Sequence, residues 1–200
     1  MTRKILALAF VLTASVPSAT FSANAEGTFS VRGLGGISCG DMVSALMSEE
    51  DTRVSERFVA WIAGYLSHAN RTHPTAHDVM PIQTLDGIAT VVARLCDNNR
   101  EATVEAVVHS VSENLSPLAL AQPEPPLEAR NGDAMVLIRP SVLEAVQEGL
   151  VARELLPGGA ADGIFGPQTS QALTALQAGL GIEQTGLPDA WTVFLIVTTE

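Results

Sequence analysis

Lysine is almost missing from this chain. The one lysine, Lys4, lies near the start, so beyond residue 25 nine arginines oppose twenty-two acidic residues and the net charge is −13. The arginines are not clustered along the sequence. Because proteins that bind nucleic acid neutralise phosphates with clustered lysine and arginine, we expect no nucleic-acid partner. The acidic excess is typical of a well-solvated surface.

Long hydrophobic runs are also missing. The apolar run at residues 5–14 is shorter than the roughly 20 residues that span a bilayer. It follows Arg3 and Lys4 and precedes the small residues 23–25, a pattern that predicts a cleaved secretory signal peptide over residues 1–25 and export of the protein. The tetrad at residues 36–39 is similar to a lipoprotein box, but it lies far beyond the apolar run. We therefore expect no membrane anchor.

Cysteine is limited to two residues, Cys39 and Cys96. In an exported protein they should form one disulfide, since the outer compartments are oxidising. Closing a loop of this size stabilises a fold by about 4 kcal/mol on the chain-entropy estimate. The alternative is a reactive thiol pair, which would usually have the close C-x-x-C spacing.

Signatures of catalysis and metal binding are scarce. The chain has no H-E-x-x-H zinc motif, and residues 49–51 form an acidic run that we interpret as a solvated turn. His68, His73 and His77 could suggest a metal site near Asp78, but they form no i, i+4 pair on a predicted helix. A pH-sensing role is the other alternative for them. We predict no enzymatic activity, no metal and no cofactor.

Residues 34–116 are predicted to form a four-helix domain that the disulfide staples. Apolar residues recur at helical spacing, and a long loop is expected over residues 70–81. Trp61 and Tyr65 are interpreted as core residues, with ligand stacking as the alternative. The predicted helices cover Asp41–Met47, Phe58–Ala69, Leu85–Cys96 and Val104–Leu115.

The rest of the chain is predicted to contain a linker and a second domain. Residues 117–133 hold four prolines and indicate a semi-rigid extended linker. Residues 134–200 predict three helices, the first over about 140–155, the second starting at Pro167 and the third over about 188–198. The predicted fold class is therefore all-α.

The most informative stretch is Asp162–Thr169, which predicts a tight turn that leads directly into a helix. Gly163 can adopt a positive φ, Phe165 anchors the turn, and Gly166 precedes a proline suited to the first helical position. The same glycine-to-threonine spacing returns from Gly186 to Thr192, so the domain contains an internal pseudo-repeat.

At these residues the sequence resembles the peptidoglycan-binding domain 1 family, whose pattern is D-G-x-F-G-P-x-T followed by A-x-x-x-x-Q. Ala172 and Gln177 stand at the last two positions of that pattern. The resemblance implies a small three-helix module that binds peptidoglycan. The candidate ligand-binding residues that it implies are Asp162, Gly163, Phe165, Gly166, Thr169, Gln147 and Gln177.

The first domain has a second resemblance. An early cysteine, the run Trp61-Ile62-Ala63-Gly64-Tyr65 and a second cysteine are similar to the HdeA/HdeB-type periplasmic acid-stress chaperones. A W-x-x-G-Y helix with a distal disulfide also occurs in periplasmic immunity proteins against cell-wall amidases. Fold transfers more safely than function in such a case.

Together these features predict a non-enzymatic periplasmic protein that binds peptidoglycan and tethers a small helical domain at the cell wall. The resemblance adds a possible chaperone role, with unfolded periplasmic proteins as partners. The alternative is a regulator, an immunity protein or a recruiting subunit for a cell-wall hydrolase.

Overall fold

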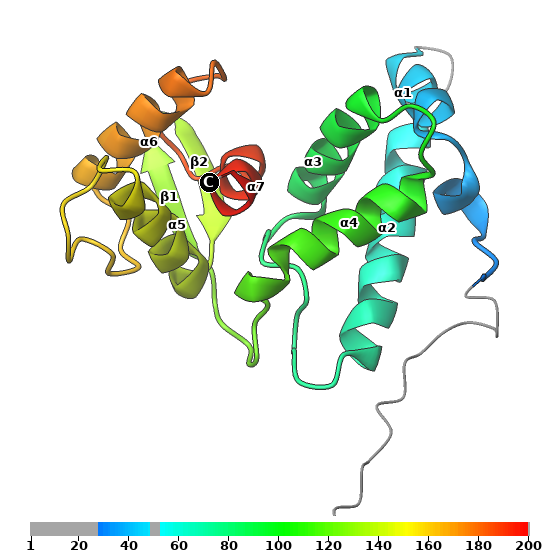
Figure 1. The fold of residues 1–200 in the computed structure, drawn as a ribbon, viewed down its shortest axis with the longest axis horizontal. Helices are drawn as coiled ribbons and strands as arrows, with labels where there is room; N and C mark the ends of the chain where they lie inside the picture. The colour runs from blue at the N-terminus through cyan, green and yellow to red at the C-terminus, as the bar shows by residue number, and fades with distance from the viewer. Residues whose placement is uncertain (1–27, 49–52, 200) are drawn as a thin grey trace, which may run out of the picture. The chain divides into compact units, whose positions relative to one another are not determined.

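Residues 28–48 and 53–199 are described in a computed structural model of the protein (Figure 1). The predicted signal peptide, residues 1–25, lies outside the described residues, and so does the acidic run at residues 49–51. In chain order the elements are η1 (Gly33–Gly36), α1 (Cys39–Met47), α2 (Arg53–Thr72), α3 (Leu85–Asn98), α4 (Val104–Leu115), η2 (Ser116–Leu118), β1 (Leu127–Asn131), β2 (Ala134–Ile138), α5 (Pro140–Ala152), α6 (Pro167–Gly179) and α7 (Ala190–Thr198).

Helices α1 to α4 pack around the first hydrophobic core. The four predicted helices are present, and α1, α3 and α4 begin at side-chain caps: Ser38, Thr84 and Thr103 each accept a hydrogen bond from the amide three residues on. Each helix buries one apolar face, as the periodicity predicts. None of the described helices has both the length and the apolarity that crossing a membrane requires.

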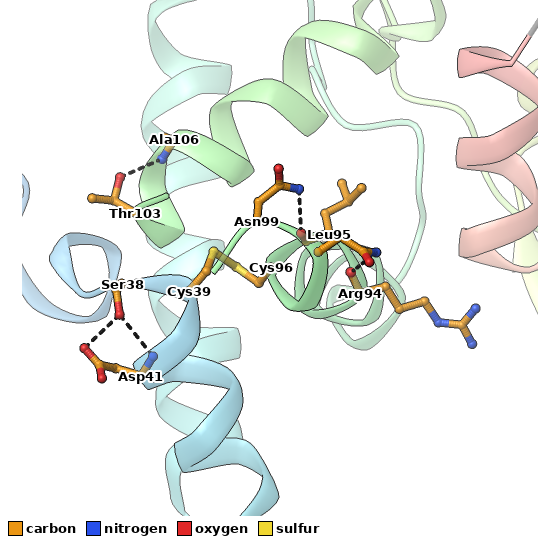
Figure 2. Close-up of a disulfide and its surroundings, with 10 residues drawn as sticks. Ser38, Cys39, Asp41, Arg94, Leu95, Cys96, Asn99, Thr103 and Ala106 are labelled. Carbon is orange, nitrogen blue, oxygen red and sulfur yellow. Dashed lines mark hydrogen bonds between the residues drawn. A yellow bond between two sulfur atoms is a disulfide. The ribbon is translucent and has the colours of Figure 1, made fainter. Parts of the chain in front are cut away.

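The disulfide between Cys39 and Cys96 joins the first turn of α1 to the last turn of α3 (Figure 2). Both cysteines are fully buried, and the two Cα atoms lie 4.8 Å apart. The backbone supports the same junction, because the Cys39 amide donates to the Ala102 carbonyl at 2.8 Å. The predicted pairing is confirmed, and since Cys39 is in a disulfide it has no free thiol for lipid attachment.

The fold is mostly helical, but the prediction of an all-α protein missed a β-hairpin. Strands β1 and β2 pair antiparallel, with Ala129 opposite Val136, and a two-residue turn joins them. Gly132 adopts φ +60° at the first position of that turn, as a type II′ hairpin turn requires. The sequence signal was the Gly-Asp dipeptide at 132–133, which the proline content of the preceding residues obscured.

Residues 117–133 are therefore not a free linker along their length. The backbone of Leu120 pairs with that of Asp78, and Leu120 itself is buried. Farther on, the segment becomes β1, whose Ala129 is fully buried. The prolines exclude helix, but the apolar residues between them anchor the segment to the fold.

Helix α7 belongs to two cores. Phe194 lies in the first core with residues of α2, α3 and α4, whereas Val193 and Ile196 lie in the second core with α5 and α6. Contacts of α7 with α3, α4 and α5 agree with this arrangement. A helix that is apolar on all sides is typically buried on all sides, and residues Val31–Glu200 accordingly form one compact unit.

Arg139 provides a polar connection between the same two cores. Its guanidinium makes an ion pair with Asp78 at 2.6 Å and donates to the carbonyls of Met80 and Pro81 at 3.2 and 3.3 Å. Both charged side chains are largely buried. Removing one partner of such a pair leaves a charge that is neither solvated nor paired, so Arg139 holds the 78–81 segment against the start of α5.

We expect Phe194→Ala to destabilise the whole of Val31–Glu200 and not α7 alone. Truncating a buried phenylalanine typically lowers the free energy of unfolding by about 3–5 kcal/mol. Because α7 contributes to both cores, denaturant unfolding followed by Trp61 fluorescence and by Trp191 fluorescence, in single-tryptophan variants, should give one coincident transition at lower denaturant.

The matched control is Ile164→Ala, since Ile164 is 66% exposed and surface truncations typically change stability by less than about 0.5 kcal/mol. Two separate transitions, with only the Trp191 transition shifted by Phe194→Ala, would contradict the shared-core interpretation.

A second stability prediction concerns the end of α5. Glu154 has φ +59°, the left-handed conformation that glycine adopts more easily than other residues, and Leu155 donates back to the Leu150 carbonyl. Glu154→Gly should raise the unfolding free energy by about 0.5–1 kcal/mol, whereas Glu154→Ala keeps the strain and should not. Chemical denaturation of the two variants beside the parent checks this, and equal stability of both would refute it.

Candidate functional site

The stretch that the sequence singled out is organised around one buried side chain, Gln147 of α5. Its amide nitrogen donates to Asp162 Oδ1 at 3.1 Å, the Ile164 carbonyl at 3.0 Å and Thr169 Oγ1 at 3.1 Å. Its amide oxygen accepts from the Asp162 and Gly163 amides at 3.0 and 2.8 Å. We call residues 162–169 with Gln147 the first glutamine turn.

The second half of the pseudo-repeat uses Gln177 of α6 in the same way. Its amide nitrogen donates to the Leu187 carbonyl and to Thr192 Oγ1, both at 3.0 Å, and its amide oxygen accepts from the Gly186 amide at 2.8 Å. Residues 185–192 with Gln177 form the second glutamine turn. Each turn thus provides hydrogen-bond partners for a buried glutamine amide, which would be destabilising if it were left unpaired. Each turn also leads directly into the next helix.

The glycines of both turns are required by space as well as by conformation. Gly163 has φ +68° and a Cβ there would lie 2.9 Å from the Pro140 carbonyl oxygen. Gly186 has φ +62°, and a Cβ would lie 2.8 Å from polar atoms of Ser170 and Thr174. At Gly163 the close atom is backbone and cannot move easily, whereas at Gly186 side chains would have to move and the positive φ is the stronger constraint.

Six of the seven predicted ligand-binding residues are brought together in the first glutamine turn, whereas Gln177 lies in the second, and most of the seven face inward. Gln147 is 1% exposed, Thr169 4% and Gln177 0%, and their polar groups are engaged within the protein. Gly163 is buried, and Phe165 and Gly166 are half-buried. Asp162 is exposed. Its neighbour Ile164, which the prediction omitted, is the most exposed large apolar side chain of the first turn.

The pKa of Asp162 lies below its ordinary value. The largest cause is the hydrogen bond that its carboxylate accepts from the Ile164 amide, followed by the one from the Gln147 side chain. Both bonds favour the charged carboxylate. The ionised Asp162 therefore stabilises the first glutamine turn in its folded form.

A pocket of about 470 Å³ lies beside the second glutamine turn. Three segments line it: residues 81–94, which lead into α3; residues 135–142, mostly of β2; and residues 182–193, which lead into α7. We call it the strand-edge pocket, because four consecutive residues of β2 form one wall. Its lining is mainly apolar, with Arg94 and Glu183 among the polar residues. Sequence reasoning missed it because it depends on the unpredicted hairpin.

The aromatic pair of α2 is structural. Trp61 donates to the Arg32 carbonyl at 2.7 Å, and its ring lies where a side chain at Gly35 would be. The Tyr65 hydroxyl lies 3.2 Å from His109 Nδ1. Burial, reinforced by Glu105 and Glu113, raises the pKa of Tyr65 to about 12. The core interpretation of these aromatics agrees with both contacts.

Residues 36–40 spell G-x-S-x-G, a nucleophile pattern that sequence reasoning overlooked. A nucleophile elbow joins a strand to a helix and presents its serine to a histidine. Here Ser38 follows the 3₁₀ turn η1, accepts from the Asp41 amide and donates to Asp41 Oδ2 at 2.8 Å. The pattern serves as a helix cap.

The histidines in the segment after α2 make separate local contacts and do not converge on one point. His73 Nδ1 accepts from the amides of Thr75 and Ala76, and the His77 amide donates to Leu120. Across residues 28–48 and 53–199, no group of three or more His, Cys, Asp or Glu side chains is arranged to hold a metal ion.

The lowered pKa of Asp162 predicts a pH-dependent contribution to stability. A carboxylate whose folded-state pKa is depressed stabilises the fold above its unfolded pKa, and this contribution is lost as the pH falls through the folded value. Wild type should therefore be more stable than Asp162→Asn at pH 6, and this advantage should shrink below about pH 4. Thermal unfolding at both pH values measures it.

Asp133→Asn serves as the matched control, since it removes one carboxylate at the exposed hairpin turn and reports the effect of net charge alone. A wild-type advantage over Asp162→Asn that is the same at pH 6 and pH 3 would contradict the role given to Asp162.

Comparison with known families agrees with the geometry of the C-terminal part. Residues 140–193 match the family described as "Putative peptidoglycan binding domain". That range contains α5, α6 and the start of α7, with both glutamine turns. No curated protein and no solved structure gives a significant match to the chain. The likeness of residues 34–116 to acid-stress chaperones thus receives no support from these comparisons.

Proposed function

We propose that this protein is a non-enzymatic component of the bacterial cell envelope that binds peptidoglycan through α5, α6 and α7 and holds the α1–α4 bundle at the wall. The observation that supports it best is the family match over residues 140–193, in a segment where both glutamine turns are fully formed. A disulfide and an expected signal peptide both suit the periplasm.

The buried contacts between the two parts support one role for the bundle over the others. Because α7 is part of both cores and Arg139 bridges them, the bundle is packed directly against the wall-binding part. This favours a positioning role over a freely swinging tether. The chaperone and hydrolase-regulator roles remain predictions from the sequence, since no contact in the described residues favours either one.

Sedimentation with isolated sacculi tests the proposal. The chain from residue 26 onward should pellet with sacculi and stay in solution without them. Its net charge of −13 makes attraction to acidic wall polymers unfavourable, so pelleting should persist from about 50 mM to about 500 mM salt, where exposed charges are screened. Retention in the supernatant at both salt concentrations would refute wall binding.

A pair of glycine variants links binding to the first glutamine turn. Gly163→Ala introduces a Cβ 2.9 Å from the Pro140 carbonyl oxygen, whereas Gly159→Ala places one in open space, although both glycines have positive φ. Gly163→Ala should reduce pelleting and Gly159→Ala should not. Circular dichroism on both variants separates a local loss of the turn from general unfolding. Equal pelleting of a folded Gly163→Ala would show that the turn is not needed.

A further inference from the structure

We infer that the strand-edge pocket binds the peptide stem of peptidoglycan, in extended form, as an added strand along the outer edge of β2. The inference rests on the proposed function and names the part of the polymer that is recognised. Five features of the pocket support it: a free strand edge, charged side chains of both signs, a buried acceptor on Gln83 without a donor, a tryptophan whose ring is already in contact, and a suitable size.

The free edge follows from the hairpin register. In a two-residue hairpin the closing pair, Asn131 and Ala134, is hydrogen-bonded, and the pairs alternate from there. The backbone groups of Met135 and Leu137 therefore point away from β1. Across the described residues no hydrogen bond engages them, and both residues line the pocket. An unpaired edge with this geometry is where extended peptides add to a sheet.

Charge at the pocket suits a peptide with carboxylates and an amine. Arg94 reaches the pocket from α3, and in Figure 2 its side chain extends on the side of the helix away from the disulfide. Glu183 lines the pocket from the segment before the second glutamine turn. Guanidinium groups bind carboxylates in a paired geometry, so Arg94 is assigned to a stem carboxylate and Glu183 to the stem amine.

Gln83 adds an unmet hydrogen-bond acceptor at the same wall. Its Oε1 is buried and is without a partner in the described part of the chain, although the residue as a whole is half-buried. A buried acceptor without a donor is destabilising. After a small rotation of this side chain into the pocket, its Oε1 could accept a hydrogen bond from an amide N–H of the bound peptide.

The aromatic contacts favour the peptide over the glycan. Sugar binding by tryptophan needs an open ring face, but Trp191 already stacks on Phe194, with 5.6 Å between ring centroids, and Arg94 lies over its ring at 5.2 Å. Both contacts stabilise the ring in place. Trp191 therefore forms a wall of the pocket and is not a free platform for a sugar.

The dimensions also fit a short extended peptide. Strands advance about 3.3 Å per residue, so three residues of a stem would cover roughly 10 Å of the edge. Small-ligand pockets typically enclose about 300–1,000 Å³, and the strand-edge pocket encloses about 470 Å³. An intact crosslinked strand of glycan would need a longer groove.

Titration of the chain from residue 26 onward with two soluble fragments tests the inference. One is the free stem tripeptide alanyl-glutamyl-diaminopimelic acid, and the other is the disaccharide of the glycan without its peptide. Isothermal calorimetry should show binding of the tripeptide only. In amide NMR spectra the largest shifts should be at Met135 and Leu137. Binding of the disaccharide with no response to the tripeptide would overturn the inference.

Charge variants give the second arm. Arg94→Gln should weaken tripeptide binding at least tenfold, whereas Arg130→Gln, the same change at an exposed arginine of β1 outside the pocket, should leave it unchanged. Leu137→Pro, which removes an outward-facing donor of the edge strand, should also weaken binding. Circular dichroism checks that each variant is folded, and tripeptide binding that survives both pocket changes in folded protein refutes the site.

The sacculus assay separates this inference from the proposed function. If wild type pellets with sacculi and Arg94→Gln pellets equally well, the pocket is not the recognition site and wall binding stands. If wild type does not pellet, wall binding fails. In that case the inference is tested only by the titration, in which binding of the tripeptide to the protein in solution supports it and lack of binding refutes it.

Discussion

The structure depends on the burial of α7 from two sides. This nine-residue helix contributes Phe194 to the core of the α1–α4 bundle, and it contributes Val193 and Ile196 to the core formed with α5 and α6. A short helix is marginal in isolation, so its stability comes from these contacts. Either core would expose apolar surface without it, which makes the two parts of the sequence interdependent even though their composition suggests separate domains.

The buried glutamines explain why the turn motif has its particular residues. A glutamine amide offers two donor hydrogens and an acceptor oxygen, and burying it is unfavourable unless all of them are used. Gln147 and Gln177 meet this condition with backbone groups of a turn that only glycine permits and with a threonine at the start of the next helix. The residues of the motif are therefore explained by folding, and the same arrangement occurs twice in one small domain.

Much of the fold could be predicted from the sequence for local reasons. Helices such as α3 and α4 have strong apolar periodicity and threonine caps, and the disulfide followed from the number of cysteines. The hairpin was harder to predict from the sequence. Pro125 and Pro126 stand directly before β1, and β2 is a continuous apolar run that lacks the alternation of polar and apolar residues typical of a half-buried strand. The double burial of α7 was visible only as apolar residues on every side of a short helix, which does not by itself say what covers each face.

The candidate site was predicted less completely, and the reason is physical. The polar groups of this motif already form hydrogen bonds within the turn. Thr169, for example, accepts a hydrogen bond from Gln147 and is not free to bind a ligand. Recognition then falls to groups that the motif leaves free: the outward backbone of β2 and the charge of Arg94, which come from segments more than forty residues apart in the chain. Such a surface exists only once α7 has joined the two cores, so the shared helix that stabilises the fold also assembles the pocket.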